Sequence, residues 1–477
     1  MSSGQLDKVT VLQSSVSLGD PHICSDSVNR LSIIFTVYEA LVKADNMGKY
    51  QPSLAESWTV EAGARKWIFN LRSDVKFHNG ETLCASDVVA TLGRVLDPAI
   101  GGSFGTQGVY SSYLGSASIT SVDDLTVRIV TEEPMADLLD LLVAMPISPE
   151  SELHKLPIEY CGSGPYRILE QDSNRTVLKV HDTYWGGPPQ YREIHWIAKR
   201  NQTDRIKALL NGQGDIATGI NYAGKEHILQ DGGAEVQELD GGLCIIFMCN
   251  AQKGPCMDRR VRQSLNYALD MNEIIRVIKK GAATPLSGYL TPHHFGYNPE
   301  TPLYTYDPVK AKSLLAEAGY EDGLKLVVDI PSVMPNEAPQ LTKLMVEQYR
   351  KVGIHVQVVE HKDRAAYADM VREKKINDAC CFDSSPRSTF RVLREKIQSS
   401  LKGPWWQGYT NKKVDKLILR AQETVNDNER QKIYRKIYAI IRDDAPWIFM
   451  YRPTNYWGVK PTLKGWKPRS DGLLLFS

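Results

Sequence analysis

An excess of charge of one sign is missing from this 477-residue chain, which carries 57 Lys+Arg and 56 Asp+Glu for a formal net charge of +1. A nucleic-acid binder or a basic membrane-surface protein needs a large field of one sign, so this balance argues against both classes. Long apolar runs are missing too, because the stretches at 138–145 and 245–248 fall far short of the ~20 residues that a membrane-spanning helix needs. At roughly 150 residues per domain, the length predicts about three structural units.

Cysteine is scarce, with eight residues in the chain and no CxxC pair or Cys/His cluster at zinc-ligand spacing. That count is far below the cysteine content of a disulfide-stapled scaffold. Cys380 and Cys381 are adjacent, and Cys244, Cys249 and Cys256 lie close together. We interpret these residues as buried apolar thiols, with one or two disulfides as the alternative. The pairing of the eight cysteines and the redox compartment both stay open.

Catalytic signatures are also missing, since the chain contains no GxSxG, no HExxH and no GxxxxGK[ST] loop. His293 and His294 are adjacent, and adjacent side chains on a strand point to opposite faces, so they do not form a metal site. Residue counts alone leave open a thiol hydrolase that pairs a Cys with a His, although no local pattern favours it. We therefore expect a protein that is not an enzyme and that has no cofactor and no metal.

Structural roles are favoured for the other conspicuous residues. His78 lies among core aromatics and is expected to be a hydrogen-bonded structural residue. Gly162 and Gly164 are expected to permit a backbone crossing rather than to cradle a phosphate. Arg260 and Arg262 flank a helix start and are expected to form ordinary surface or interdomain pairs.

Strand-like and helix-like segments alternate along the chain, which predicts the α/β class. Period-2 patterns occur at 8–16 and 126–131, and helical spacing occurs at 86–96, 258–280, 307–318, 339–352 and 414–443. Asp258 stands where an N-cap is expected, and Pro308 and Gly319 bracket the next helix. The segments 324–330, 339–352 and 353–360 predict a β-α-β unit, and therefore parallel strands in a mixed sheet.

Several blocks of sequence together carry a resemblance to a known family. They are YEALVKADNMGKYQPSLAESWTV (38–60), KWIFNLRSDVKFHNGETLCASDVVATLGRVLDP (66–98), CGSGPYRI (161–168), FMCNAQKGPCMDRRVRQSLNYALDMNEIIRVI (247–278) and WWQGYTNKKVDKLILRAQETVNDNERQKIYRKIYAIIRDDAPWIFMY (405–451). In this order they resemble the family 5 extracellular solute-binding proteins, which are the peptide, nickel and oligosaccharide receptors of bacterial ABC importers. The resemblance covers roughly residues 30–475.

The resemblance implies the fold and the domain organisation. The expected fold is the α/β type II periplasmic-binding-protein fold, with two α/β lobes and an extra subdomain inserted in lobe I. The expected parts are lobe I (1–47, 162–243 and 449–477), the inserted subdomain (48–161) and lobe II (244–448).

The resemblance also implies a function. A receptor of an ABC importer captures a peptide or peptide-like small solute in a cleft between the lobes and delivers it to the permease subunits in the membrane. Such a receptor is expected to be a periplasmic or extracellular monomer that binds no nucleic acid. The N-terminus, MSSGQLDKVT, shows no basic segment followed by an apolar core, so a cytosolic solute sensor or chaperone of the same fold is an alternative. A receptor for a metal chelate or an opine-like compound is another.

Charged ligand-binding residues follow from the resemblance. Peptide receptors of the family place an Asp just after a strand of the second lobe, where it pairs with the amino group of the peptide; here Asp383 fits best, and helix capping near 388–390 is its alternative role. Arg364, Arg387 and Arg391 are candidates for an anionic group, with structural ion pairs as the alternative. The segment 331–335 lacks the Arg that dipeptide receptors carry there, which puts strict dipeptide specificity in doubt.

Aromatic residues are the remaining candidates for the ligand pocket. Phe382 immediately precedes Asp383 at the end of the apolar strand. A Gly- and Pro-bounded loop supplies Trp405, Trp406 and Tyr409, and we expect one indole in the core and the other in the pocket. Tyr110, in a Gly/Ser-rich stretch, is a further candidate.

Overall fold

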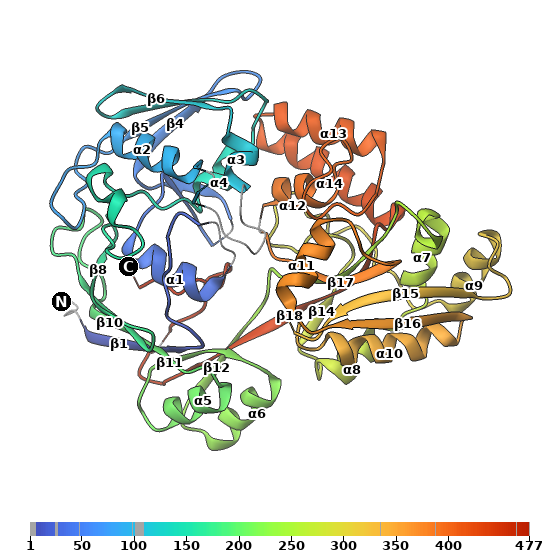
Figure 1. The fold of residues 1–477 in the computed structure, drawn as a ribbon. Helices are drawn as coiled ribbons and strands as arrows, with labels where there is room; N and C mark the ends of the chain where they lie inside the picture. The colour runs from blue at the N-terminus through green and yellow to red at the C-terminus, as the bar shows by residue number, and fades with distance from the viewer. Residues whose placement is uncertain are drawn as a thin grey trace. The chain divides into compact units, whose positions relative to one another are not determined.

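The computed structural model describes residues 6–23, 27–46, 48–97, 99–100, 109–333, 335–386, 388–463 and 465–476. The chain divides into two compact units (Figure 1), where unit 1 holds Met1–Leu239 with Asn455–Ser477 and unit 2 holds Asp240–Thr454. The sequence-based lobe limits and the insertion at 48–161 stay predictions. Within the described ranges, no helix is both long and apolar enough to cross a membrane.

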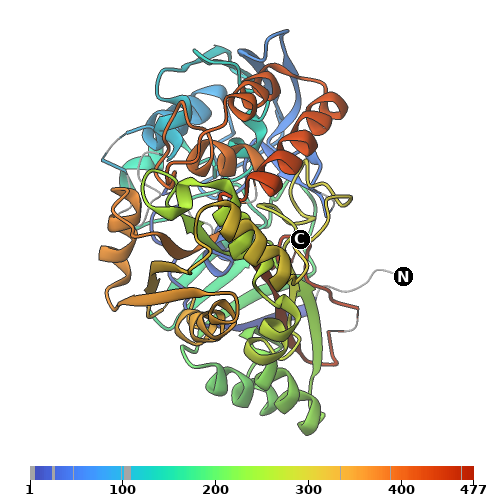
Figure 2. The same ribbon diagram turned by 90° about the vertical axis from the view of Figure 1, so that its right-hand side faces the viewer.

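Unit 1 is built on a mixed sheet. Its strands are β1 (Leu6–Gln13), β8 (Tyr166–Gln171), β9 (Arg175–Val180), β10 (Tyr191–Ala198), β11 (Ile216–Ile220) and the C-terminal part of β18 (Trp447–Val459). The order is β18-β11-β1-β10-β9-β8, and β1 is parallel to both β10 and β11. Helix α1 (Val28–Val37) contributes to the core together with Tyr38, Tyr166 and Trp196. Helices α5 (Gln202–Leu210) and α6 (Tyr222–Asp231) lie side by side in both views (Figures 1 and 2).

A second, antiparallel sheet of unit 1 lies within residues 55–130. Its order is β4 (Ala55–Val60), β5 (Lys66–Leu71), β7 (Thr126–Val130) and β6 (Ser118–Asp123). Trp67, Phe69 and Leu71 alternate with more exposed residues on β5, as half-buried strands do. The remaining elements of this part are β2 (Val42–Ala44), β3 (Tyr50–Pro52), α2 (Ala85–Val95), α3 (Val109–Leu114), α4 (Leu138–Leu142) and the short 3-10 helix Glu150–Lys155. Helix α2 packs against β6 and β7.

Unit 2 contains the predicted β-α-β unit. Its strands are β13 (Cys244–Cys249), β14 (Ala283–Pro285), β15 (Leu324–Pro331), β16 (Ile354–His361), β17 (Ala379–Ser384) and the N-terminal part of β18. The order is β16-β15-β17-β13-β18, with β15 parallel to β16 and β17. The prediction of parallel strands in a mixed sheet is therefore confirmed, because α10 (Ala338–Arg350) supplies the crossover between β15 and β16.

Helices cover both faces of this sheet (Figure 1). One face packs on α11 (Arg364–Arg372), α12 (Thr389–Lys396), α13 (Lys412–Glu423) and α14 (Asp427–Asp444). The other packs on α7 (Arg259–Tyr267), α8 (Met271–Ile278), α9 (Pro308–Glu317) and α10. Strand β12 (Glu235–Asp240) and the 3-10 helix Pro255–Met257 complete the elements of the described chain.

Two segments predicted as single helices are each two helices. The segment 258–280 breaks into α7 and α8 because Asp270 caps α8 by accepting from the backbone N of Glu273 at 3.0 Å. The segment 414–443 breaks between α13 and α14, where Asn426 accepts from the backbone N of Glu429 at 3.1 Å. Arg430, in the first turn of α14, donates back to the carbonyls of residues 424 and 425. These two carbonyls lie between the helices, and the guanidinium supplies their hydrogen-bond donor.

The prediction of ordinary ion pairs is right for Arg260 and wrong for Arg262. The Arg260 guanidinium lies 2.6 Å from Asp258 and remains largely exposed. Arg262 points into the core of unit 2 and is buried. It donates to the backbone carbonyls of residues 256, 257, 444 and 445. Its guanidinium therefore links the segment before α7 to the C-terminal end of α14 and does not pair with a carboxylate.

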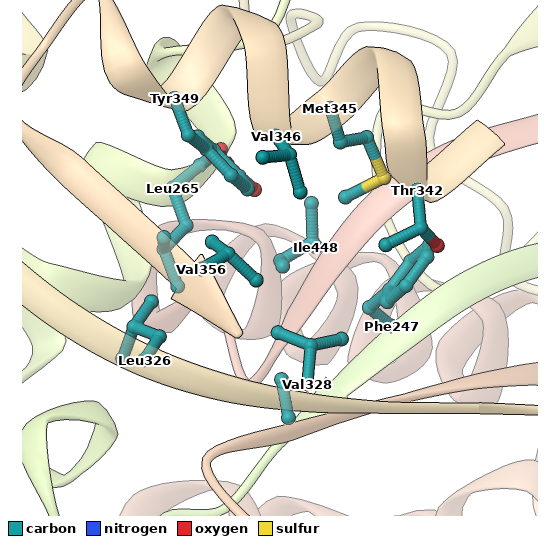
Figure 3. Close-up of a pocket in the computed structure, with 11 residues that line it drawn as sticks. Phe247, Leu265, Leu326, Val328, Thr342, Met345, Val346, Tyr349, Val356 and Ile448 are labelled. Carbon is teal, nitrogen blue, oxygen red and sulfur yellow. Dashed lines mark hydrogen bonds between the residues drawn. The ribbon is translucent and has the colours of Figure 1, made fainter. Parts of the chain in front are cut away.

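A small cavity lies in the core of unit 2 beneath α10 (Figure 3). Apolar side chains surround it, including Phe247, Leu326, Val328 and Met345. A void with such a lining offers almost nothing to a charged group, so we assign it to core packing rather than to ligand binding.

Candidate ligand-binding site

The candidate site lies at the carboxyl edge of three parallel strands in unit 2. Because β15, β16 and β17 run in one direction, their carboxyl ends share one edge of the sheet. Helix α11 begins three residues after β16 ends, and α12 begins five residues after β17 ends. These short connections bring the start of each helix close to the end of its strand. Ligands of open α/β sheets commonly bind at such an edge.

Asp383 lies one residue before the end of β17 and forms an ion pair with Arg364 at the start of α11. The Arg364 Nη2 and the Asp383 Oδ1 are 3.8 Å apart, and the two side chains keep 19% and 29% of their surface exposed. The Arg364 guanidinium also lies over the rings of Phe382 (5.1 Å) and Tyr367 (5.6 Å). The two predicted anchors of opposite charge are thus neighbours on adjacent elements.

The capping role considered for Asp383 is wrong. Ser388 is the N-cap of α12, and its Oγ accepts from the backbone N of Arg391 at 3.1 Å. Since the cap position is filled by the serine hydroxyl, the Asp383 carboxylate is not needed there.

Of the other two predicted arginines, the structure describes only Arg391. Arg391 donates from Nε to Glu395 Oε1 at 2.9 Å, one helical turn away, and both side chains are mostly buried. This is the structural pair that was the alternative to ligand binding. Arg387 lies outside the described residues. Ligand-binding roles for both stay predictions.

The predicted aromatic residues are core residues in this structure. Phe382, Trp405 and Tyr409 belong to one buried cluster, in which the rings of Phe382 and Trp405 are 5.0 Å apart. Trp406 donates from Nε1 to the backbone O of Tyr409 at 2.7 Å, and the Tyr409 hydroxyl donates to Asp444 at 2.6 Å. Burial raises the pKa of the Tyr409 hydroxyl, so it stays a neutral donor. Contact of these rings with a ligand stays a prediction.

Tyr110 belongs to unit 1, where it lies on α3 and is buried. Its hydroxyl donates to the backbone O of Ala144 at 3.4 Å. A ligand-binding role for Tyr110 also stays a prediction.

Sequence reasoning missed three polar residues near this edge. Lys396, at the end of α12, is buried, lies over the rings of Phe382 (5.4 Å) and Trp405 (5.8 Å), and donates to the backbone O of Asp383 at 3.3 Å. Asp329 on β15 and His361 on β16 form a hydrogen-bonded pair. The available signal was the predicted parallel pairing, which brings the ends of the two predicted strands, and so Asp329 and His361, to the same edge.

The structural roles predicted for His78 and the two glycines are confirmed. His78 Nε2 lies 3.0 Å from the backbone O of Gly164, and the backbone N of Gly162 donates to His78 Nδ1 at 3.3 Å. Burial lowers the pKa of His78 to about 4. A Cβ at either glycine would lie less than 3 Å from the backbone of Val37, so this crossing needs glycine.

The described cysteines are mostly buried thiols, and His293 and His294 are hydrogen-bonded to the backbone. Seven cysteines are described as free thiols, six of them buried as predicted, and Cys24 lies outside the described residues. Burial raises the pKa of Cys244 to about 12. His293 and His294 bond the backbone oxygens of Asp240 and Pro386 respectively. Within the described ranges, no three His, Cys, Asp or Glu residues are grouped as metal ligands.

Comparison with known proteins shows the family. The profile of bacterial extracellular solute-binding proteins, family 5 (middle part), matches residues 49–379. The heme-binding protein A of Haemophilus influenzae is 28% identical over 449 residues, which are 87% of this chain and 81% of that protein. The dipeptide-binding protein of Escherichia coli K12 is 27% identical over 445 residues, 87% of this chain and 83% of that protein.

Solved structures show the same fold. HbpA2 from Haemophilus parasuis matches with a TM-score of 0.85 and 22% identity, over 98% of this chain and 99% of that one. The periplasmic binding protein DppA from Helicobacter pylori, solved with the peptide STSA, matches with a TM-score of 0.80 and 22% identity, over 99% of both chains. The predicted α/β fold of periplasmic binding proteins is therefore confirmed. With most of its length matched by the family profile, the chain belongs to family 5 of the bacterial extracellular solute-binding proteins.

Proposed function

We propose that this protein is the solute-binding receptor of an ABC importer, which captures a peptide or peptide-like solute and delivers it to the permease subunits in the membrane. Family membership supports a binding protein rather than an enzyme. Relatives named for dipeptide and glutathione binding support a solute with an amine and carboxylates. The family description supports work outside the cytoplasmic membrane, in the periplasm or at the cell surface. We also propose that the receptor is a monomer.

The observation that carries this proposal is the Asp383–Arg364 pair at the carboxyl edge of β17. Both groups remain partly exposed, and they are 3.8 Å apart, which is longer than a well-formed ion-pair hydrogen bond. An incoming ammonium group can take the Asp383 carboxylate, while an incoming carboxylate can take the fork of the Arg364 guanidinium. A zwitterionic solute thus adds a charge-assisted contact to each member of this partly exposed pair.

Native mass spectrometry and calorimetric titration test the proposal. Mass spectrometry of freshly purified protein identifies any retained solute, and di-, tri- and tetra-alanine and glutathione serve as titrants. Loss of one side of a desolvated ion pair costs roughly 3–5 kcal/mol, so Asp383→Asn should weaken binding at least about a hundredfold. The matched control is Asp369→Asn, because Asp369 lies on α11 in an exposed pair with Arg372 at 2.6 Å.

The outcomes separate the possibilities. A hundredfold loss for Asp383→Asn with an unchanged affinity for Asp369→Asn supports the proposal. Binding by Asp383→Asn within threefold of the wild type would remove the amine-anchor role. A covalently altered solute after incubation would show an enzyme rather than a receptor.

A further inference from the structure

Asp329 is a completely buried carboxylate in the middle of the candidate edge. Its side chain has 0% of its surface exposed. The backbone N and the side-chain Nδ2 of Asn377 donate to it at 2.7 and 3.0 Å, and the Nε2 of His361 lies 2.9 Å from its Oδ1. A buried carboxylate is tolerated only with such partners. Of these donors, His361 alone can carry a positive charge.

His361 lies at the same edge as the Asp383–Arg364 pair. It is the last residue of β16 and is paired in register with Pro331, the last residue of β15. The His361 ring lies 5.2 Å from the Tyr367 ring, and the Arg364 guanidinium lies 5.6 Å from that same ring. Tyr367 is held in place because its hydroxyl donates to the backbone oxygens of Asp329 (3.2 Å) and Cys381 (2.6 Å). The imidazole and the guanidinium thus both pack near the same fixed ring.

The bond to Asp329 decides which nitrogen of His361 is available. An ionised carboxylate only accepts, so the Nε2 must carry its hydrogen, and this assignment follows from the hydrogen bond. The Nδ1 is the remaining nitrogen, and the side chain keeps 26% of its surface exposed. Among the residues that the structure describes, none is hydrogen-bonded to that Nδ1. When the imidazole is protonated, the Nδ1 is therefore a second N–H donor.

We propose that His361 binds an anionic group of the solute, such as a carboxylate, through Nδ1–H, and that Asp329 is the positioning residue that holds the imidazole in this orientation. The inference rests on the proposed receptor function. The solute that we expect is a zwitterion. Its carboxylate binds His361 and Arg364, and its amine binds Asp383. Binding then takes up a proton wherever the free imidazole is neutral.

The surrounding charges act on this proton in both directions. Asp329 on β15, whose Oδ1 lies 2.9 Å from the Nε2, attracts it, and the carboxylate of Asp383 on β17 also attracts it. The Arg364 guanidinium on α11 repels it, and Tyr367 is neutral because burial raises the pKa of its hydroxyl. Glu360, the neighbour of His361 on β16, accepts from the Ser332 hydroxyl at 2.7 Å. A solute carboxylate adds a further negative charge and therefore raises the proton affinity of the imidazole.

The experiment is calorimetric titration of the wild type and variants with the alanine peptide or glutathione that binds the wild type most tightly. It runs from about pH 5.5 to about pH 7.5, where the amine of the peptide stays mostly protonated. Two buffers of different ionisation enthalpy measure the protons taken up. The wild-type affinity is expected to fall with rising pH, by up to about tenfold per pH unit above the pKa of the imidazole.

His361→Gln is expected to bind at least about tenfold more weakly at the low end of this range and to lose both the pH dependence and the proton uptake. Asp329→Asn is expected to move the midpoint of the pH profile to lower pH, because the imidazolium loses its carboxylate. His355→Gln is the matched control, since His355 is an exposed histidine on the same strand, and its profile should equal that of the wild type.

The readings distinguish this inference from the proposed function. A wild type that binds, an Asp383→Asn variant that loses affinity, and a His361→Gln variant that keeps the wild-type affinity and pH profile would overturn the inference and leave the receptor function standing. A wild type that binds none of these titrants would overturn both. If Asp329→Asn does not fold, His361→Gln still decides the outcome, because glutamine retains an N–H donor for the Asp329 carboxylate.

Discussion

Arg262 offers the most direct test of how unit 2 is held together. It is buried on α7, and its Nη1 donates to the carbonyls of Cys256 and Met257 at 2.9 Å each. Its Nη2 donates to the carbonyl of Asp444 at 2.9 Å, and its Nε reaches the carbonyl of Ala445 at 3.2 Å. The last two carbonyls belong to the C-terminal end of α14, where backbone acceptors have no partner within the helix and where a cation also meets the negative end of the helix dipole.

Arg262→Ala should therefore be strongly destabilising. Each hydrogen bond from a charged donor contributes about 1.5–3 kcal/mol, and breaking a buried charged network typically costs about 3–5 kcal/mol in total, because the separate losses overlap. We expect the free energy of unfolding to fall by about 4 kcal/mol. In a unit of this length that change lowers Tm by roughly 8–16 °C. Arg262→Lys should recover only a small part, since one ammonium group cannot reach four carbonyls at once.

Differential scanning calorimetry and urea unfolding followed by tryptophan fluorescence measure these changes. Arg260→Ala is the matched control, because Arg260 lies two residues away on the same helix with its guanidinium largely exposed beside Asp258. We expect its Tm to stay close to the wild-type value. An Arg262→Ala variant that loses less than about 1 kcal/mol, or no more than Arg260→Ala, would refute the reasoning that the four carbonyls depend on this side chain.

Two further predictions concern unit 1. Gly164→Ala should lower Tm more than Gly93→Ala, a substitution on α2 with nothing within 4 Å of the added Cβ, because the Cβ at 164 would lie 2.7 Å from the Val37 carbonyl; parallel thermal scans measure this, and equal shifts would contradict it. The pKa of His78 is lowered to about 4, below the ordinary value of 6.5, so the unfolded chain binds a proton that the folded chain does not bind between these pH values. Stability from His78 is therefore complete above about pH 6.5 and is lost as the pH falls toward 4, by about 3 kcal/mol in all. Urea unfolding at pH 7 and pH 5 should show a smaller acid loss for His78→Gln than for the wild type, and an equal loss would speak against it.

Much of the fold followed from local patterns in the sequence. The β-α-β unit at 324–360 was predictable because the first strand is mostly apolar, the second carries Ile354, Val356 and Val358 at alternate positions, and the segment between them shows the 3.6-residue spacing of a helix, which is the usual crossover between parallel strands. The break between α7 and α8 was not predictable from hydrophobic spacing, because the apolar positions continue through it, whereas the break before α14 is followed by a polar stretch at 426–432. The deciding groups are single side chains, Asp270 and Asn426, whose oxygens cap the following helix.

The burial of Arg262 lay beyond local sequence reasoning for a different reason. Two of its four partners are backbone carbonyls about 180 residues away in the chain, and a carbonyl has no signature in the sequence. An arginine close to Arg260 at a helix start is predicted to be a surface residue, since charged side chains are rarely buried without a partner. The tertiary fold supplies the partner, so the residue type alone misleads.

The candidate site shows the same division between local and long-range information. Asp383 was named as a candidate because of the family resemblance together with its place after an apolar strand, which is a local pattern. His361 and Asp329 were not, because their pairing depends on the register of β16 beside β15, and their proximity to Asp383 depends on β17 lying on the other side of β15. A strand order of this kind is set by the packing of helices from distant parts of the chain on both faces of the sheet. The residues to which we assign the solute in our proposal therefore become neighbours only in the folded unit, and variants along that edge have to be compared together.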